Sequence, residues 1–134
     1  MSFFHLLASD RPLPLCDCRS LRTVVSGQVS FSGELGFSVE NCTCYLDEQA
    51  HGGIKAYVYR MPYLVWDEST LRDLKRYLNR RLSSGDQAQL WHIWLGDDGS
   101  DGPPARYRGR LADLDMEEFQ LLFGKEELCL TVTI

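Results

Sequence analysis

The chain has 134 residues and a formal net charge of −5, with 44% hydrophobic and 25% charged residues. This length and composition predict a single domain over residues 1–134 and exclude disordered, collagen-like and coiled-coil classes. The charge is unevenly spread. Residues 1–53 carry three basic and six acidic groups, residues 54–83 carry seven and three, and residues 84–134 carry four and ten. This distribution argues against a protein that coats nucleic acid and favours a specific partner.

The N-terminal segment and the cysteines bear on the compartment. Residues 1–10 lack the positive n-region and the apolar stretch of a secretory signal, and no run reaches the roughly 18 to 20 apolar residues that cross a bilayer. Five cysteines are an odd number, in a domain too large to need disulfides. We therefore expect a cytoplasmic protein with mostly free thiols, no membrane association and no cofactor.

The first part of the chain is predicted to be mostly extended. Residues 10–20 contain two prolines, which indicates an extended connector. Apolar and polar residues alternate over residues 21–31, with a bend at Gly27, and again over residues 35–46. These two strands are predicted to form one long antiparallel hairpin, and residues 54–61 a third strand.

The second part mixes helices and strands. Leucines recur at spacings of three and four over residues 67–82, which predicts a helix that begins at the capping residue Asp67. The remaining predicted elements, in chain order, are a strand at 89–95, a loop at 96–104, a strand at 105–111, a short helix from 113 or 115 to 123 and a strand at 128–134.

This order predicts an α+β fold. From about residue 54 it runs β-α-β-β-α-β, which resembles the split βαβ arrangement of ferredoxin-like domains in the order of elements only. With the hairpin in front, the chain reads β-β-β-α-β-β-α-β, and we expect an antiparallel sheet with two helices on one face. A six-stranded sheet with the first hairpin at its centre fits the same order. Whether the hairpin covers or extends the sheet stays open.

Two pairs of cysteines form the candidate metal site. Cys16 and Cys18 are one residue apart, as are Cys42 and Cys44, and four thiolates can hold zinc in a tetrahedron. A one-residue gap is an infrequent zinc spacing, and free cysteine commonly packs as a small buried hydrophobe. We interpret the four as structural thiols.

Charged and aromatic residues supply the candidate contacts to a partner. Three arginines recur at helical spacing on the predicted helix, two tyrosines share one face of the third strand, and aspartates crowd the loop at 96–104. The candidate partner-binding residues are Arg72, Arg76, Arg80, Tyr57, Tyr59, Asp97, Asp98 and Asp101.

We find no nucleophile elbow, phosphate-binding loop or dinucleotide fingerprint. We therefore expect a small non-enzymatic protein that binds a protein partner, for example an inhibitor or immunity-type protein whose acidic segments at 97–101 and 113–118 cover a basic target. The alternative is a small enzyme or ligand-binding domain whose pocket joins His92 to Cys42 or Cys129. A third hypothesis is weak RNA binding through the helix arginines, although nucleic acid is a disfavoured partner. The oligomeric state stays open.

Overall fold

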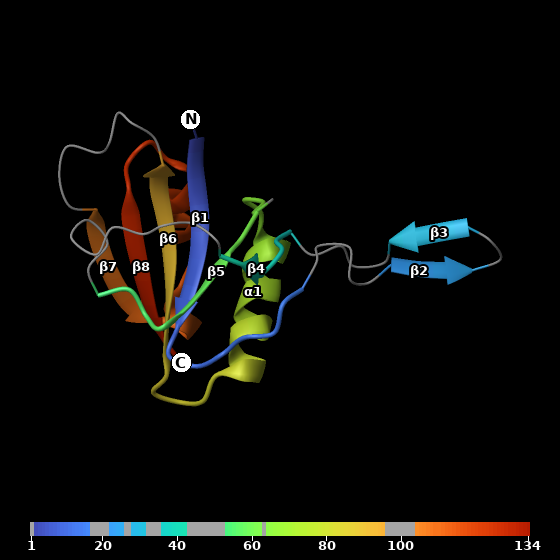
Figure 1. The fold of residues 1–134 in the computed structure, drawn as a ribbon, viewed down its shortest axis with the longest axis horizontal. Helices are drawn as coiled ribbons and strands as arrows, with labels where there is room; N and C mark the ends of the chain where they lie inside the picture. Colours follow the sequence, from blue (N-terminus) through green and yellow to red (C-terminus); the bar gives the residue numbers. More distant parts are fainter. Residues whose placement is uncertain are drawn as a thin grey trace.

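A six-stranded sheet in the order β4-β5-β1-β6-β8-β7 organises the chain (Figure 1). The computed structural model describes residues 2–16, 22–25, 28–31, 36–42, 53–62, 64–95 and 104–134, with the backbone alone for residues 2–3, 22–25, 28–31 and 94–95. The strands of the sheet are β1 (Ser2–Ser9), β4 (Glu40–Asn41), β5 (Tyr57–Arg60), β6 (Gln87–Leu95), β7 (Ala105–Arg110) and β8 (Leu128–Thr133).

Strand β1, which the sequence pattern does not predict, lies inside the sheet. It pairs antiparallel with β5 and β6, so that Leu7 stands opposite both Tyr59 and Leu90. Leu6, Leu7 and Ala8 are all buried, which means that both faces of the strand are covered. A strand buried on both faces shows a continuous apolar run instead of an alternation, and this removes the signal on which strand prediction depends.

The sheet is mixed, and the prediction of a purely antiparallel sheet is wrong. β7 and β8 pair in parallel, with Tyr107 opposite Leu130. Residues 111–127 make the crossover between them, and parallel neighbours need a connection of this length. The observed order also differs from the predicted ferredoxin-like one, since β8 lies between β6 and β7 and β1 lies between β5 and β6.

The front hairpin forms differently from the prediction. β2 (Arg22–Val25) pairs with β3 (Gln28–Phe31) as a separate two-stranded sheet, so the hairpin is not the centre of the six-stranded one (Figure 1). The predicted bend at Gly27 lies outside the described residues. Of the predicted strand at 35–46, the described part contains only β4 and a single bridge between Cys16 and Val39.

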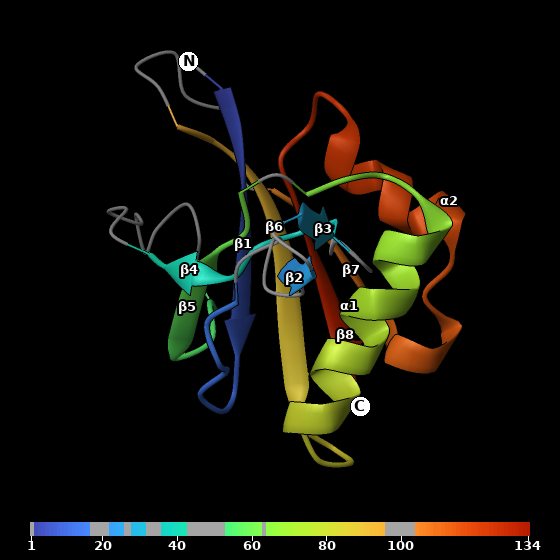
Figure 2. The same ribbon diagram turned by 90° about the vertical axis from the view of Figure 1, so that its right-hand side faces the viewer.

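The helices confirm their sequence signals. α1 (Glu68–Arg81) begins after Asp67, whose side chain accepts a hydrogen bond from the Thr70 amide at 2.7 Å. α2 (Met116–Phe119) begins after Asp115 in the same way. The 3-10 turn η1 (Leu111–Asp113) precedes α2, and the 3-10 turn η2 (Gln120–Phe123) follows it. Figure 2 shows both helices on the same side of the sheet. No helix among the described ranges has the length and apolar character needed to cross a bilayer.

The predicted connector packs onto the body of the fold. Residues 12–15 have no regular structure, yet Leu13 is buried and its amide donates a hydrogen bond to the Tyr59 hydroxyl at 2.8 Å. The Tyr77 hydroxyl donates to the Pro14 carbonyl. Burial in the low-dielectric interior raises the pKa of Tyr77 well above its ordinary value of 10.0.

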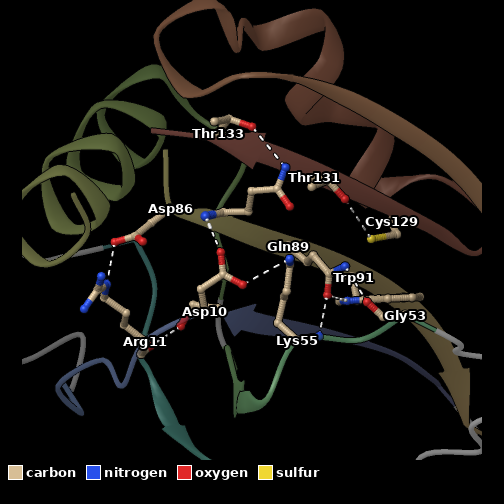
Figure 3. A network of polar contacts seen from close by, with 12 residues as sticks. Asp10, Arg11, Gly53, Lys55, Asp86, Gln89, Trp91, Cys129, Thr131 and Thr133 are labelled. Carbon is tan, nitrogen blue, oxygen red and sulfur yellow. Dashed lines mark hydrogen bonds and ion pairs between the residues drawn. The ribbon is translucent and has the colours of Figure 1, made fainter. Parts of the chain in front are cut away.

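The sheet face away from the helices has its own core, made by Leu6, Ala8, Trp91, Ile93 and Cys129. Part of its cover is the segment before β5. The Gln89 side chain accepts from the Lys55 amide at 2.9 Å and donates to the Gly53 carbonyl at 2.9 Å (Figure 3). One amide side chain thus satisfies two backbone groups of the covering segment, which a purely apolar face would leave unpaired.

Candidate functional site

Two histidines lie side by side on the helix-covered face of the sheet. His5 of β1 and His92 of β6 are cross-strand partners, and their ring centroids are 5.0 Å apart. His92 Nε2 contacts the Gly124 carbonyl at 2.9 Å, and His5 Nε2 contacts the Leu122 carbonyl. Because carbonyls only accept hydrogen bonds, each Nε2 carries its hydrogen, and His92 Nδ1 is left as an acceptor 3.2 Å from His5 Nε2. This arrangement suits two neutral rings.

Burial favours the neutral form of both rings, because it lowers the pKa of each. Removal from water lowers the pKa of His5, and a positive charge on neighbouring His92 would lower it further, against the opposing effect of the Leu122 carbonyl. Burial also lowers the pKa of His92, against the opposing effects of the Gly124 carbonyl and the Glu127 carboxylate. The pair fastens the end of η2 to the sheet.

An aromatic row leads from the histidines to the surface. Phe123 of η2 lies 5.2 Å from His5 and 5.4 Å from Phe119, centroid to centroid, and Trp66 lies 6.5 Å from Phe123. Trp66 is 51% exposed, and Tyr107 on β7 is 42% exposed. Both line a groove of about 560 Å³, together with Phe123, Leu121, Leu128, Gln120, Gly124, Lys125 and Glu126. We call this the aromatic groove.

Two of the three arginines predicted to bind a partner, Arg72 and Arg76, line a second, mixed-charge groove. Arg72, Arg76 and Arg80 are exposed on α1, away from its buried leucines. Arg72 and Arg76 border a groove of about 450 Å³ between α1 and α2, which also presents Glu68, Lys75 and Asp115. The opposite charges in this groove reduce its attraction for a polyanion.

Of the remaining predicted contacts, the structure describes Tyr57 and Tyr59, and these two differ in exposure. Tyr57 is 42% exposed, whereas Tyr59 is buried and holds the connector through its hydroxyl. Tyr59 therefore belongs to the core. Asp97, Asp98 and Asp101 lie outside the described residues.

Sheet geometry separates the predicted thiols from the predicted histidine. His92 and Trp91 are adjacent on β6 and point to opposite faces, and Cys129 is the cross-strand partner of Trp91. Cys42 packs into the same core as Trp91 and Cys129. Neither thiol therefore shares a face with His92. Burial raises the pKa of Cys129, against the opposing effect of its contact with the Thr131 hydroxyl, so its thiolate is disfavoured.

The cysteine pairs are only half described. Cys16 packs against the helix-covered core, and Cys42 packs against the core on the opposite face of the sheet. The sheet therefore lies between these two thiols. Cys18 and Cys44 lie outside the described residues. Within the described part of the chain, no three His, Cys, Asp or Glu side chains gather as a metal would require.

The sequence reasoning missed the participation of His5, Trp66 and Phe123. The missed strand β1 hid His5, because pairing with His92 requires knowing that β1 and β6 are neighbours. Trp66 stands directly before the capping residue Asp67, a position where an apolar residue often packs against the new helix. That signal was present in the sequence, although it does not predict an exposed ring.

Comparison with known proteins adds no relative: no protein-family model, no curated protein and no solved structure matches this chain.

Proposed function

We propose that this protein is a non-enzymatic binding protein whose aromatic groove receives a segment of a partner protein. The observation that supports this proposal is the pair of exposed rings, Trp66 and Tyr107, on the walls of one groove. Large exposed aromatic side chains are the residues on which protein interfaces depend most, since each offers a wide contact area with few rotatable bonds.

The groove is also well supported from beneath. Phe123 in its wall packs against His5 and Phe119, and the carbonyls of Leu122 and Gly124 are held by the two histidines. A wall fixed before binding loses little conformational freedom when a partner arrives. Preorganisation of this kind favours affinity.

The other hypotheses receive less support. The enzyme hypothesis depends on a thiol beside His92, and Cys42 and Cys129 belong to the core on the opposite face. RNA binding through α1 would have to overcome the acidic neighbours Glu68 and Asp115. The acidic loop of the inhibitor hypothesis lies outside the described residues, so that version stays a prediction.

Selection from a displayed library of short random peptides tests the proposal. We expect the wild-type protein to enrich peptides that contain large apolar residues. The double variant Trp66→Ser/Tyr107→Ser should bind these peptides at least about tenfold more weakly, which corresponds to a loss of about 1.4 kcal/mol.

Val65→Ser is the matched control, because Val65 is also exposed and apolar but does not line the groove. Circular dichroism establishes that all variants keep their fold. Enrichment that is equal for the wild type and the double variant would refute the proposal.

A further inference from the structure

Strand β7 ends the sheet with an exposed edge. It pairs with β8 on one side, and no described strand pairs with it on the other (Figure 1). The Ala105 amide donates to the Glu127 carbonyl at 3.1 Å, on the β8 side. Since successive residues of a strand direct their backbone groups to opposite sides, the amides and carbonyls of Arg106, Arg108 and Arg110 point away from β8. The outward groups of Arg108 and Arg110, beside which no described strand lies, form a ready template for another strand.

The same three residues carry positive side chains on one face. Arg106 pairs with Cys129, whose face is that of Trp91, and the Arg106 guanidinium lies 5.2 Å above the Trp91 ring. Arg108 and Arg110 follow at spacings of two and share this face. The structure gives Arg108 and Arg110 no ion pair within the described residues. A chain of net charge −5 thus concentrates three positive charges along five residues of an open edge.

The other face of β7 offers room for the side chains of an added strand. Tyr107 lines the aromatic groove, and no atom lies within 4 Å of the position that a Cβ on Gly109 would occupy. A hollow of about 120 Å³ lies here, bordered by Tyr107, Gly109, Leu114 and Leu130 and, at its polar part, by Asp113 and Glu118 among others. In a strand paired with β7, every second side chain would therefore lie over the arginines. The side chains between them would point into this space.

We propose that β7 binds an extended acidic segment of a partner protein as a seventh strand, with acidic side chains over the arginines and apolar ones towards the aromatic groove. This inference rests on the proposed function and names the partner's chemistry. Main-chain pairing would supply affinity, and the alternation would supply specificity.

The positive charge of β7 favours an acidic segment over a second copy of the chain as the strand that pairs with it. In an antiparallel pair of β7 strands centred on Arg108, Arg106 of each copy would stand opposite Arg110 of the other. Like charges directly across a ladder are destabilising. An acidic strand places a carboxylate at each of these positions instead.

The probe is a fluorescent peptide of alternating glutamate and valine, with both termini capped so that they carry no charge. Its binding to the wild-type protein is measured by anisotropy at low and rising salt. Two control peptides have lysine in place of glutamate, or the same composition with all glutamates before all valines. We expect the alternating peptide to bind at least about tenfold more tightly than either control, and to weaken as salt screens the charges.

Three variants separate charge from main-chain pairing. Arg108→Glu/Arg110→Glu should weaken binding by about tenfold or more, since two attractions become repulsions. Arg72→Glu/Arg76→Glu makes the same change of net charge on α1 and should leave binding within about twofold. Arg108→Pro should bind about fivefold more weakly than Arg108→Ala, because only proline also removes the outward amide. Proline is tolerated at an edge position of this kind, and circular dichroism checks the fold.

Several results would overturn the inference that β7 binds an acidic strand. Equal weakening by the α1 and β7 reversals, or equal binding of the alternating and block peptides, would overturn the inference, since either means that charge alone attracts the probe. A concentration-dependent dimer that Arg108→Pro abolishes would also overturn it, because the edge would then serve self-association. If the library peptides need Trp66 and Tyr107 but the alternating peptide does not bind, the edge inference fails and the proposed function stands.

Discussion

The two edges of the six-stranded sheet differ in how much of the chain covers them. At the β4 edge, where Glu40 and Asn41 are themselves exposed, the outward side of Val39 is paired with the connector: the Cys16 amide donates to the Val39 carbonyl at 3.0 Å and the Val39 amide donates to the Cys16 carbonyl at 2.8 Å. At the β7 edge, every residue from Arg106 to Arg110 is exposed. The two edges therefore differ: one is paired with the connector, whereas no described strand pairs with the outer side of β7.

This difference has a physical reason. An open edge invites pairing with any extended chain, and proteins protect such edges by shortening, covering or charging them. The β4 edge strand has two residues. Directly before it, Val39 forms a bridge with Cys16 of the connector. The β7 strand has six residues and carries charge instead. Charge repels a second copy but admits a segment of opposite sign, so this form of protection is also selective.

The largest effect is expected at the closed edge, from Gly36→Ala. A Cβ on Gly36 would lie 1.8 Å from Thr70 Oγ1 and 2.8 Å from Thr70 Cβ, and Thr70 is buried at the start of α1. Since neither backbone can move without breaking the edge contacts, we expect the free energy of unfolding to fall by about 3 kcal/mol. Urea denaturation measures this loss.

A double variant tests the reason for that loss. Gly36→Ala/Thr70→Ala removes the nearest clashing atom, so the double variant should be more stable than the sum of the two single changes predicts. Strict additivity would show that Gly36 matters for some reason other than its contact with Thr70.

A smaller effect is expected from acid, which protonates His5 and His92 on the two central strands, β1 and β6. Burial holds the pKa of both His5 and His92 below their ordinary value of 6.5. The unfolded chain then takes up protons first, so stability should be nearly constant between about pH 7 and pH 8 and should fall as the pH drops below 6.5. Asp10, Asp67 and Asp86 have pKa values lowered from 3.8 and lose their stabilising effect only at still lower pH.

Unfolding by urea at pH 7 and pH 5 checks this window. His92→Asn should reduce the difference between the two pH values, because one of the two buried imidazoles is gone. Nearby Glu127 favours protonation of His92, so Glu127→Gln should enlarge the difference. A wild-type protein equally stable at both pH values would contradict the neutral pair.

Much of the fold follows from local signals in the sequence, and the exceptions share a cause. The α1 helix and the strands β6 and β8 show clear periodicity or apolar runs between turn residues, and these predictions are confirmed. β1 shows none, because both of its faces are buried. The parallel pairing of β7 with β8 depends on which strands become neighbours, and no local pattern encodes that choice.

The candidate site was less predictable than the fold for the same reason. The aromatic groove joins Trp66 from the start of α1, Tyr107 from β7 and Phe123 from η2. These residues are far apart in the sequence, and only the sheet order brings them together. Arg106, Arg108 and Arg110 alternate with other residues in the sequence, yet their exposure follows from the position of β7 at the edge.

The smallest expected difference is also the most direct test of the two edges, because it compares the loss of one oxygen atom from two tyrosines on the same face of the sheet. Tyr59→Phe leaves the Leu13 amide without its acceptor in a buried place, and we expect a loss of about 1.5 kcal/mol. Tyr107→Phe removes a hydroxyl from an exposed ring and should change stability by less than about 0.5 kcal/mol. Both variants keep the ring, so packing is unchanged and urea denaturation compares the hydroxyls alone. Equal losses would mean that the Tyr107 hydroxyl is held as firmly as that of Tyr59, and an edge whose side chains are held in this way would be a poor template for an incoming strand.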